Sequence, residues 1–128
     1  MTFEQGLIGM PQLKRFVLAK EPDAEPLLWL ASHDDDAVSF LVIDPKLIAP
    51  DYRIHLSEEV RESLSLGMSD EPIVLAISII APEWTSSTAN LYAPLVICSS
   101  TMRGAQITLP ESKYRVDQPL VQSEAPTN

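Results

Sequence analysis

Residues 73–80 read Ile73-Val74-Leu75-Ala76-Ile77-Ser78-Ile79-Ile80, with Ser78 as the one polar residue in the run. A half-exposed strand shows a polar side chain at every second position, whereas residues 73–77 have no polar face. The run is also far too short to cross the roughly 30 Å hydrocarbon core of a bilayer. It therefore predicts a central β-strand that is covered on both sides.

Shorter runs rich in Val, Ile, Leu, Phe and Tyr flank this stretch and are separated by turn signals such as Asp44-Pro45 and Arg103-Gly104. Eleven prolines spread along the chain argue against long helices, since each interior proline costs a helix about 3 kcal/mol. Many short strands with regular turns are typical of an all-β protein, here a small antiparallel barrel-like domain. The expected strands are residues 14–19, 27–31, 38–44, 52–56, 73–80, 88–91, 95–98 and 105–109.

Residues 52–56 and 105–109 alternate apolar and polar positions, so both should be half exposed. One short helix is expected after Ser57, which can cap it, while Glu58 and Glu59 suit the positive end of its dipole. Gly67 is expected to end that helix in a left-handed conformation.

The chain has 128 residues and 45% hydrophobic side chains, enough for one core. We expect a single domain over residues 1–120 and a mobile tail over residues 121–128. Cys98 is the only cysteine, so no intramolecular disulfide is possible, and we expect it to be a small buried side chain. No signal peptide is visible at the N-terminus, which favours the cytoplasm.

The net charge of −9 narrows the classes of partner. Nucleic-acid binders need a surplus of Lys and Arg to displace counterions from phosphate, and an anionic membrane surface makes the same demand. We therefore expect no direct contact with nucleic acid or a membrane. The acidic charge either steers the protein towards basic proteins or serves solubility alone.

No catalytic pattern stands out in the sequence. The only histidines are His33, beside three aspartates, and His55, on the expected solvent face of a strand. None of the four glycines forms a phosphate-binding loop, and no nucleophile motif is present. These observations favour a protein that is not an enzyme and that needs neither a cofactor nor a metal.

Several segments, in order, resemble the FliW family of flagellar assembly factors. The similarity begins in the glycine-containing segment 2–10 and continues through Phe40-Leu41-Val42-Ile43-Asp44-Pro45 and Pro50-Asp51-Tyr52. It then includes Thr88-Ala89-Asn90-Leu91-Tyr92-Ala93-Pro94 and Arg103-Gly104-Ala105. One departure is the lack of a strand that the family usually has before residue 2, which leaves a sheet edge either open or closed by another element.

The resemblance implies a protein that binds flagellin in the cytoplasm and, when flagellin is exported, binds the RNA-binding regulator CsrA. Antagonising CsrA would relieve repression of flagellin synthesis. The alternative from another class is a small-molecule-binding β-barrel with an enclosed apolar pocket. We expect a monomer, with dimerisation through an open edge as the other possibility.

The two best-matched stretches supply the candidate partner-binding residues, each with a structural alternative. Asp44 can simply cap a turn, Tyr52 can pack in the core, and Asn90 can bond a neighbouring backbone group. The full set is Asp44, Pro45, Pro50, Asp51, Tyr52, Thr88, Asn90, Leu91 and Pro94.

Overall fold

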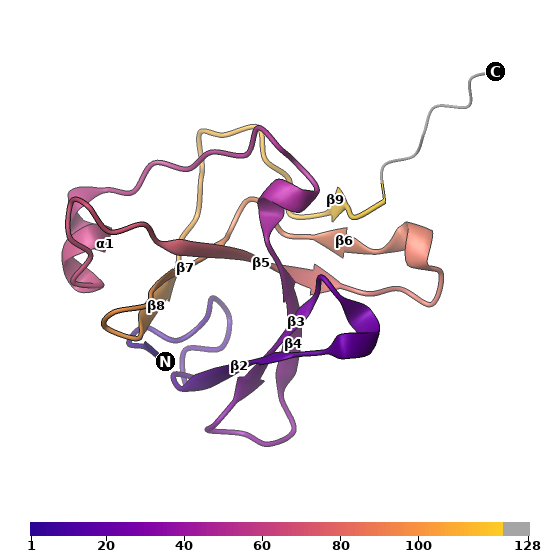
Figure 1. Ribbon diagram of the computed structural model, residues 1–128, viewed down its shortest axis with the longest axis horizontal. Helices are drawn as coiled ribbons and strands as arrows, with labels where there is room; N and C mark the ends of the chain where they lie inside the picture. The colour runs from indigo at the N-terminus through magenta and orange to yellow at the C-terminus, as the bar shows by residue number, and fades with distance from the viewer. Residues whose placement is uncertain (122–128) are drawn as a thin grey trace.

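The computed structural model describes residues 1–121 and contains mostly strands, with one short α-helix (Figure 1). The predicted mobile tail lies, from residue 122 onwards, outside the described residues. The strands are β1 (Thr2–Phe3), β2 (Phe16–Lys20), β3 (Leu28–Ser32), β4 (Ser39–Ile43), β5 (Ile73–Ile79), β6 (Thr88–Ala89), β7 (Leu95–Cys98), β8 (Arg103–Gln106) and β9 (Gln118–Pro119). The helix is α1 (Glu58–Ser63), and the 3-10 helices are η1 (Pro22–Ala24), η2 (Pro45–Leu47) and η3 (Trp84–Ser86).

The apolar run that predicted a central strand forms β5, and the prediction is confirmed. One edge of β5 pairs with β4, and the other pairs first with β7 and then with β6. Leu75 belongs to one buried cluster and Ala76 to another, so successive side chains of β5 enter cores on its two faces. This double coverage is why the strand has no polar face around its middle.

The sheet curls into a nearly closed barrel in the order β1-β8-β7-β5-β4-β3-β2. Its pairs are antiparallel, as expected, except that β1 runs parallel to β8. Thr2 also bridges Arg15 just before β2, and the Phe3 amide donates to the Lys14 carbonyl at 2.7 Å. The lack of the family's usual first strand left two possibilities for this sheet edge. The N-terminal segment itself closes the edge.

The barrel interior is filled by a cluster that includes Phe3, Phe16, Leu30, Leu75 and Leu95. A second cluster lies on the other face of β5 and includes Tyr52, Ala76, Ala89 and Leu91. A third lies under α1 and includes Leu64, Leu66, Val96 and Cys98, which confirms that Cys98 is a buried side chain. In Figure 1, α1 lies on the opposite side of the molecule from β6 and β9.

The predicted strand over residues 52–56 is wrong, although its alternation is right. Tyr52 is buried and Arg53 and His55 are exposed, but the segment is extended without a ladder partner. Packing of Tyr52 and Ile54 against the second cluster imposes the alternation in place of strand pairing. The segments 88–91 and 105–109 form shorter strands than predicted, ending at Ala89 and Gln106, although Ile107 and Leu109 still donate backbone hydrogen bonds to Pro94 and Tyr92.

The helix begins as predicted and ends differently. The Ser57 hydroxyl accepts a hydrogen bond from the Val60 amide at 3.2 Å, as an N-cap does. The left-handed residue after the helix is Ser65, with φ of 54°, and not Gly67. Ser65 donates to the Glu62 carbonyl and Leu66 to the Arg61 carbonyl, which is the Schellman pattern. The helix ends two residues earlier than Gly67 suggested because buried Leu66 anchors the chain first.

Candidate functional site

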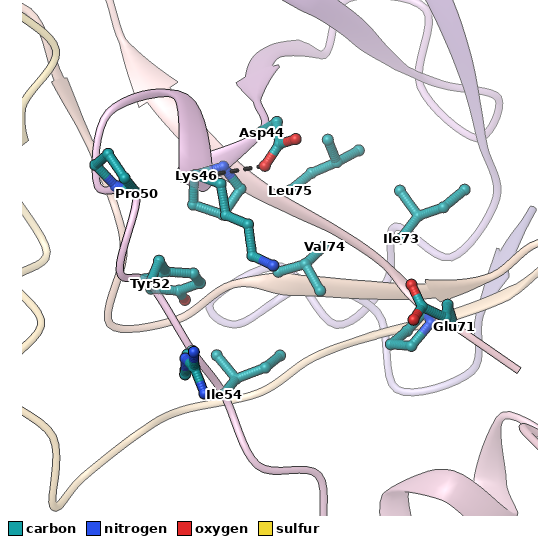
Figure 2. A pocket seen from close by; sticks show the side chains of 12 residues that line it. Asp44, Lys46, Pro50, Tyr52, Ile54, Glu71, Ile73, Val74 and Leu75 are labelled. Atoms are coloured by element: carbon teal, nitrogen blue, oxygen red, sulfur yellow. Dashed lines mark hydrogen bonds between the residues drawn. The ribbon is translucent and has the colours of Figure 1, made fainter. Parts of the chain in front are cut away.

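A groove of about 670 Å³ opens where β4 ends and the first half of β5 begins (Figure 2). One wall is η2 with the segment that follows it, and the other is β5 with the two residues before it. A volume of this size lies within the range of ligand-binding sites. The lining residues are Asp44, Pro45, Lys46, Pro50, Tyr52, Arg53, Ile54, Glu71, Pro72, Ile73, Val74 and Leu75.

The wall on the η2 side follows from the Asp44-Pro45 pair. Pro45 has no amide to continue pairing with β5, and its ring suits the first position of a helical turn. The Asp44 carboxylate accepts a hydrogen bond from the Lys46 amide at 3.0 Å, drawn dashed in Figure 2. Asp44 therefore caps the turn, which was the structural role considered for it in the sequence. Its side chain remains exposed.

Tyr52 forms the base of the groove. Its side chain is 2% exposed, and its hydroxyl donates to the Leu91 carbonyl at 2.8 Å. Its ring lies 4.5 Å from that of Tyr114, whose hydroxyl accepts a hydrogen bond from the Arg53 amide at 2.9 Å. Burial, with the nearby Tyr114, raises the pKa of Tyr52 well above its ordinary value. The phenol therefore stays neutral and acts as a donor at physiological pH.

Four charged side chains line the groove, namely Asp44, Lys46, Arg53 and Glu71. All four are exposed, and none of them forms an ion pair with another part of residues 1–121. In Figure 2 the Lys46 side chain extends into the groove towards Val74. Two carboxylates and two cations give this surface no net charge, unlike the chain as a whole.

The structure brings together the first stretch of predicted residues. Asp44, Pro45, Pro50 and Tyr52 line the groove, and Asp51 lies beside it in the exposed turn. The sequence did not reveal the β5 wall or the contribution of Lys46 to the opposite wall. The one available signal was Pro45 directly after a buried strand, because a proline there must interrupt pairing with the neighbouring strand.

The second stretch of predicted residues lies outside the groove and contacts its lining through Leu91. Leu91 and Pro94 are buried, and Leu91 receives the Tyr52 hydrogen bond. The Asn90 side chain accepts hydrogen bonds from the Tyr92 and Ala93 amides, which is the structural alternative stated for it. Thr88, in β6, pairs with Ile79 of β5 on one side and with Pro119 of β9 on the other. Leu91 packs in the same buried cluster as Tyr52, and none of the four residues lines the groove.

The acidic turn that includes Asp34 has a structural role. Its carboxylate accepts hydrogen bonds from the Lys14 and Arg15 amides at 2.9 and 2.8 Å and forms an ion pair with the Arg15 guanidinium at 2.9 Å. The Arg15 and Lys14 amides, followed by the Arg15 side chain, lower the pKa of Asp34 from its ordinary 3.8 to about 2. This turn therefore ties the β3–β4 hairpin to the segment before β2.

Within residues 1–121, no group of three or more His, Cys, Asp and Glu side chains is arranged to hold a metal ion. In the same part of the chain, no helix has the length and apolar character needed to span a membrane. The groove itself is open to solvent and carries charged side chains, whereas the small-molecule alternative requires an enclosed apolar pocket.

The protein-family model for "FliW protein" matches residues 1–120. The chain belongs to the FliW family. The resemblance seen in the sequence is therefore confirmed.

Relatives of this FliW-family chain carry the name "Flagellar assembly factor FliW". One, from Clostridium beijerinckii, is 35% identical over 121 residues, covering 94% of this chain and 86% of that protein. Another, from Caldanaerobacter subterraneus subsp. tengcongensis, is 33% identical over 121 residues, covering 94% of this chain and 81% of that protein. A crystal structure of the flagellar assembly factor FliW superposes with a TM-score of 0.90 at 30% identity, covering 97% of this chain and 86% of that one.

The FliW barrel places the matched segments beside one another. Phe3 lies against Gly104 of β8, and a Cβ atom at Gly104 would come within 2.6 Å of the Phe3 ring. Phe3 also contacts Phe16 edge to face, with 5.5 Å between the ring centroids. The glycine-containing N-terminal segment and the Arg103-Gly104-Ala105 segment thus belong to one closing contact of the barrel.

Proposed function

We propose that this chain is a flagellar assembly factor that binds flagellin in the cytoplasm and, once flagellin has been exported, binds a CsrA-type RNA-binding regulator. Binding to the regulator antagonises it and relieves repression of flagellin synthesis. The action is a switch between two protein contacts, with no catalytic step and no cofactor.

The observation that carries this proposal is the family match over residues 1–120, together with relatives named "Flagellar assembly factor FliW". The net charge of −9 supports attraction to a basic regulator, because complementary charge raises association rates. The groove between η2 and β5 supports a protein-binding role, since it has charged sides, an aromatic base and apolar walls.

A genetic experiment in the source organism tests the switch. Deleting the gene is expected to lower flagellin protein and shorten or abolish filaments, because the regulator then stays free to repress translation. Deleting the CsrA-type regulator in the same strain is expected to restore the flagellin level. A flagellin level that is unchanged in the first strain, or not restored in the second, would contradict the proposal.

A further inference from the structure

The first half of β5 has one edge that no strand covers. The pairing of β5 with β4 ends at Ala76, opposite Ile43. From there the chain turns away into η2, so Ile73, Val74 and Leu75 pair with β7 alone. The uncovered edge faces the groove, and all three residues line it.

The direction of the backbone groups along β5 can be worked out from a single hydrogen bond. The Asn90 amide donates to the Ile77 carbonyl at 2.9 Å, so the backbone groups of Ile77 face β6 and β7. Since these groups alternate in direction along a strand, those of Leu75 and Ile73 face β7 too. The N–H and C=O of Val74 therefore face the groove.

The opposite side of the ladder supports the same assignment. The Ile107 amide donates to the Pro94 carbonyl at 3.0 Å, so Pro94 faces β8. By alternation Leu95 and Ile97 then face β5, where their partners are Leu75 and Ile73. Val74 and its partner Val96 form the pair without hydrogen bonds between them.

No group of residues 1–121 replaces the missing strand. Continuing the β4 register places Pro45 opposite Val74, and proline has no N–H to offer. The Pro45 carbonyl already accepts hydrogen bonds from the Ile48 and Ala49 amides. Val74 thus presents one backbone donor and one acceptor to the groove, the pair of groups with which a strand edge recruits another chain.

We propose that the groove binds a protein partner by strand addition, in which an extended segment of the partner pairs with the backbone of Val74. The segment has a residue other than proline opposite Val74 and carries charges of both signs, because the groove offers Asp44 and Glu71 as well as Lys46 and Arg53. Only Ile73, Val74 and Leu75 are uncovered, so the added strand is short.

Flagellin is the protein that contributes the segment, a choice that rests on the proposed function. The charges lining the groove cancel, so this surface does not select a uniformly basic protein such as the regulator. Attraction of a basic protein is better served by the acidic remainder of the surface, which carries the net charge of −9.

Hydrogen exchange at single residues, followed by NMR on the full chain with and without intact flagellin, reports the contact directly. The Val74 amide should exchange more slowly in the complex, because it gains a hydrogen bond there. The Ile73 and Leu75 amides are already bonded to β7 and should change little. Calorimetry on the same samples establishes whether flagellin binds at all.

Two variants of Val74 separate the backbone from the side chain. Val74→Pro removes the N–H on the groove side and leaves the pairs with β7 intact, so flagellin affinity should fall about tenfold. Val74→Ala keeps the N–H and should retain most of the affinity. Should Val74→Pro fail to fold, the exchange experiment on the unaltered protein still decides the matter.

The outcomes of these experiments distinguish strand addition at Val74 from flagellin binding in general. Flagellin binding with slowed Val74 exchange and a weakened Val74→Pro variant supports strand addition. Flagellin binding with Val74 exchange unchanged overturns strand addition and leaves the proposed function standing. Absence of flagellin binding overturns the proposed function, and strand addition by flagellin falls with it.

Discussion

Two side chains in this barrel stabilise it by hydrogen bonds to backbone groups that are distant in the sequence. Tyr52 is the clearest case, because its hydroxyl reaches across the second cluster to the Leu91 carbonyl. Asp34 does the same for the Lys14 and Arg15 amides. Tyr52 was predicted from the sequence as a possible contact residue, and in the fold it has a structural role, as Asp34 does.

Replacing Tyr52 with Phe should lower the free energy of unfolding by about 1–3 kcal/mol, because the buried Leu91 carbonyl loses its donor. Chemical denaturation of the two proteins measures the difference. Tyr92→Phe is a matched control, since the Tyr92 hydroxyl forms no hydrogen bond within the described residues. Equal losses in the two variants would show that the Tyr52 bond does not stabilise the fold.

Asp34 makes part of the stability depend on pH. Its pKa is lowered in the folded state, from 3.8 to about 2, so the folded protein holds the charged form more strongly than the unfolded chain does. This contribution is fully present above pH 3.8 and is lost as the pH falls through about 2. The stability gap between the wild type and Asp34→Asn should therefore narrow as the pH is lowered over that range.

Asp36 provides the comparison for that titration. It lies in the same turn, and its carboxylate accepts no hydrogen bond from residues 1–121. Asp36→Asn should leave the melting temperature close to that of the wild type at each pH. Carboxylates of this kind titrate between roughly pH 5 and pH 2. A stability difference between the wild type and Asp34→Asn that stays constant over this range would show that Asp34 does not make stability depend on pH.

Strands and helices in this fold end at residues that interrupt their regular hydrogen bonding. Pro45 ends the pairing of β4 with β5 and so creates the groove. Ser65 ends α1 in a conformation that glycine adopts with much less strain, with φ of 54°. The expectation that Gly67 has this task was wrong by two residues.

Ser65→Gly should raise the free energy of unfolding by about 0.5–1 kcal/mol, because it removes the strain of a left-handed serine. Thermal or chemical unfolding measures the change. Ser63→Gly, at the last residue of the helix, should act in the opposite direction by a similar amount. A loss of stability in Ser65→Gly would show that the left-handed residue is not strained.

Gly104→Ala should lower the free energy of unfolding by about 1–3 kcal/mol, because its Cβ would meet the Phe3 ring at 2.6 Å in the contact that closes the barrel. Gly67→Ala is the control, since its Cβ would meet only the Asp70 carboxylate at 3.1 Å, which has room to move. Chemical denaturation of the two variants compares them. Similar stabilities would mean that the Phe3 contact tolerates a methyl group.

For the molecule as a whole, local patterns predicted the strands better than the site. The apolar run of β5 and the cap at Ser57 are local signals, and both predictions are confirmed. The groove joins residues 44–54 to residues 71–75, and no local pattern reports that two such segments meet. The extended segment after Tyr52 imitates a strand because packing alone produces the same alternation.

Closure of the barrel bears on how the molecule associates. The N-terminal segment pairs with β8 and bridges to the start of β2, which removes the open edge that would favour a dimer. A monomer therefore remains the prediction for solution. The short uncovered edge at Val74 lies inside the groove, where η2 and Tyr52 restrict what can approach it.

The proposed switch is tested by calorimetric titration of the purified protein with flagellin and with the CsrA-type regulator of the same organism, at low and high salt. We expect binding to both proteins, with the regulator complex weakening as salt rises because the attraction is between opposite charges. No binding to either protein at tens of micromolar would contradict it.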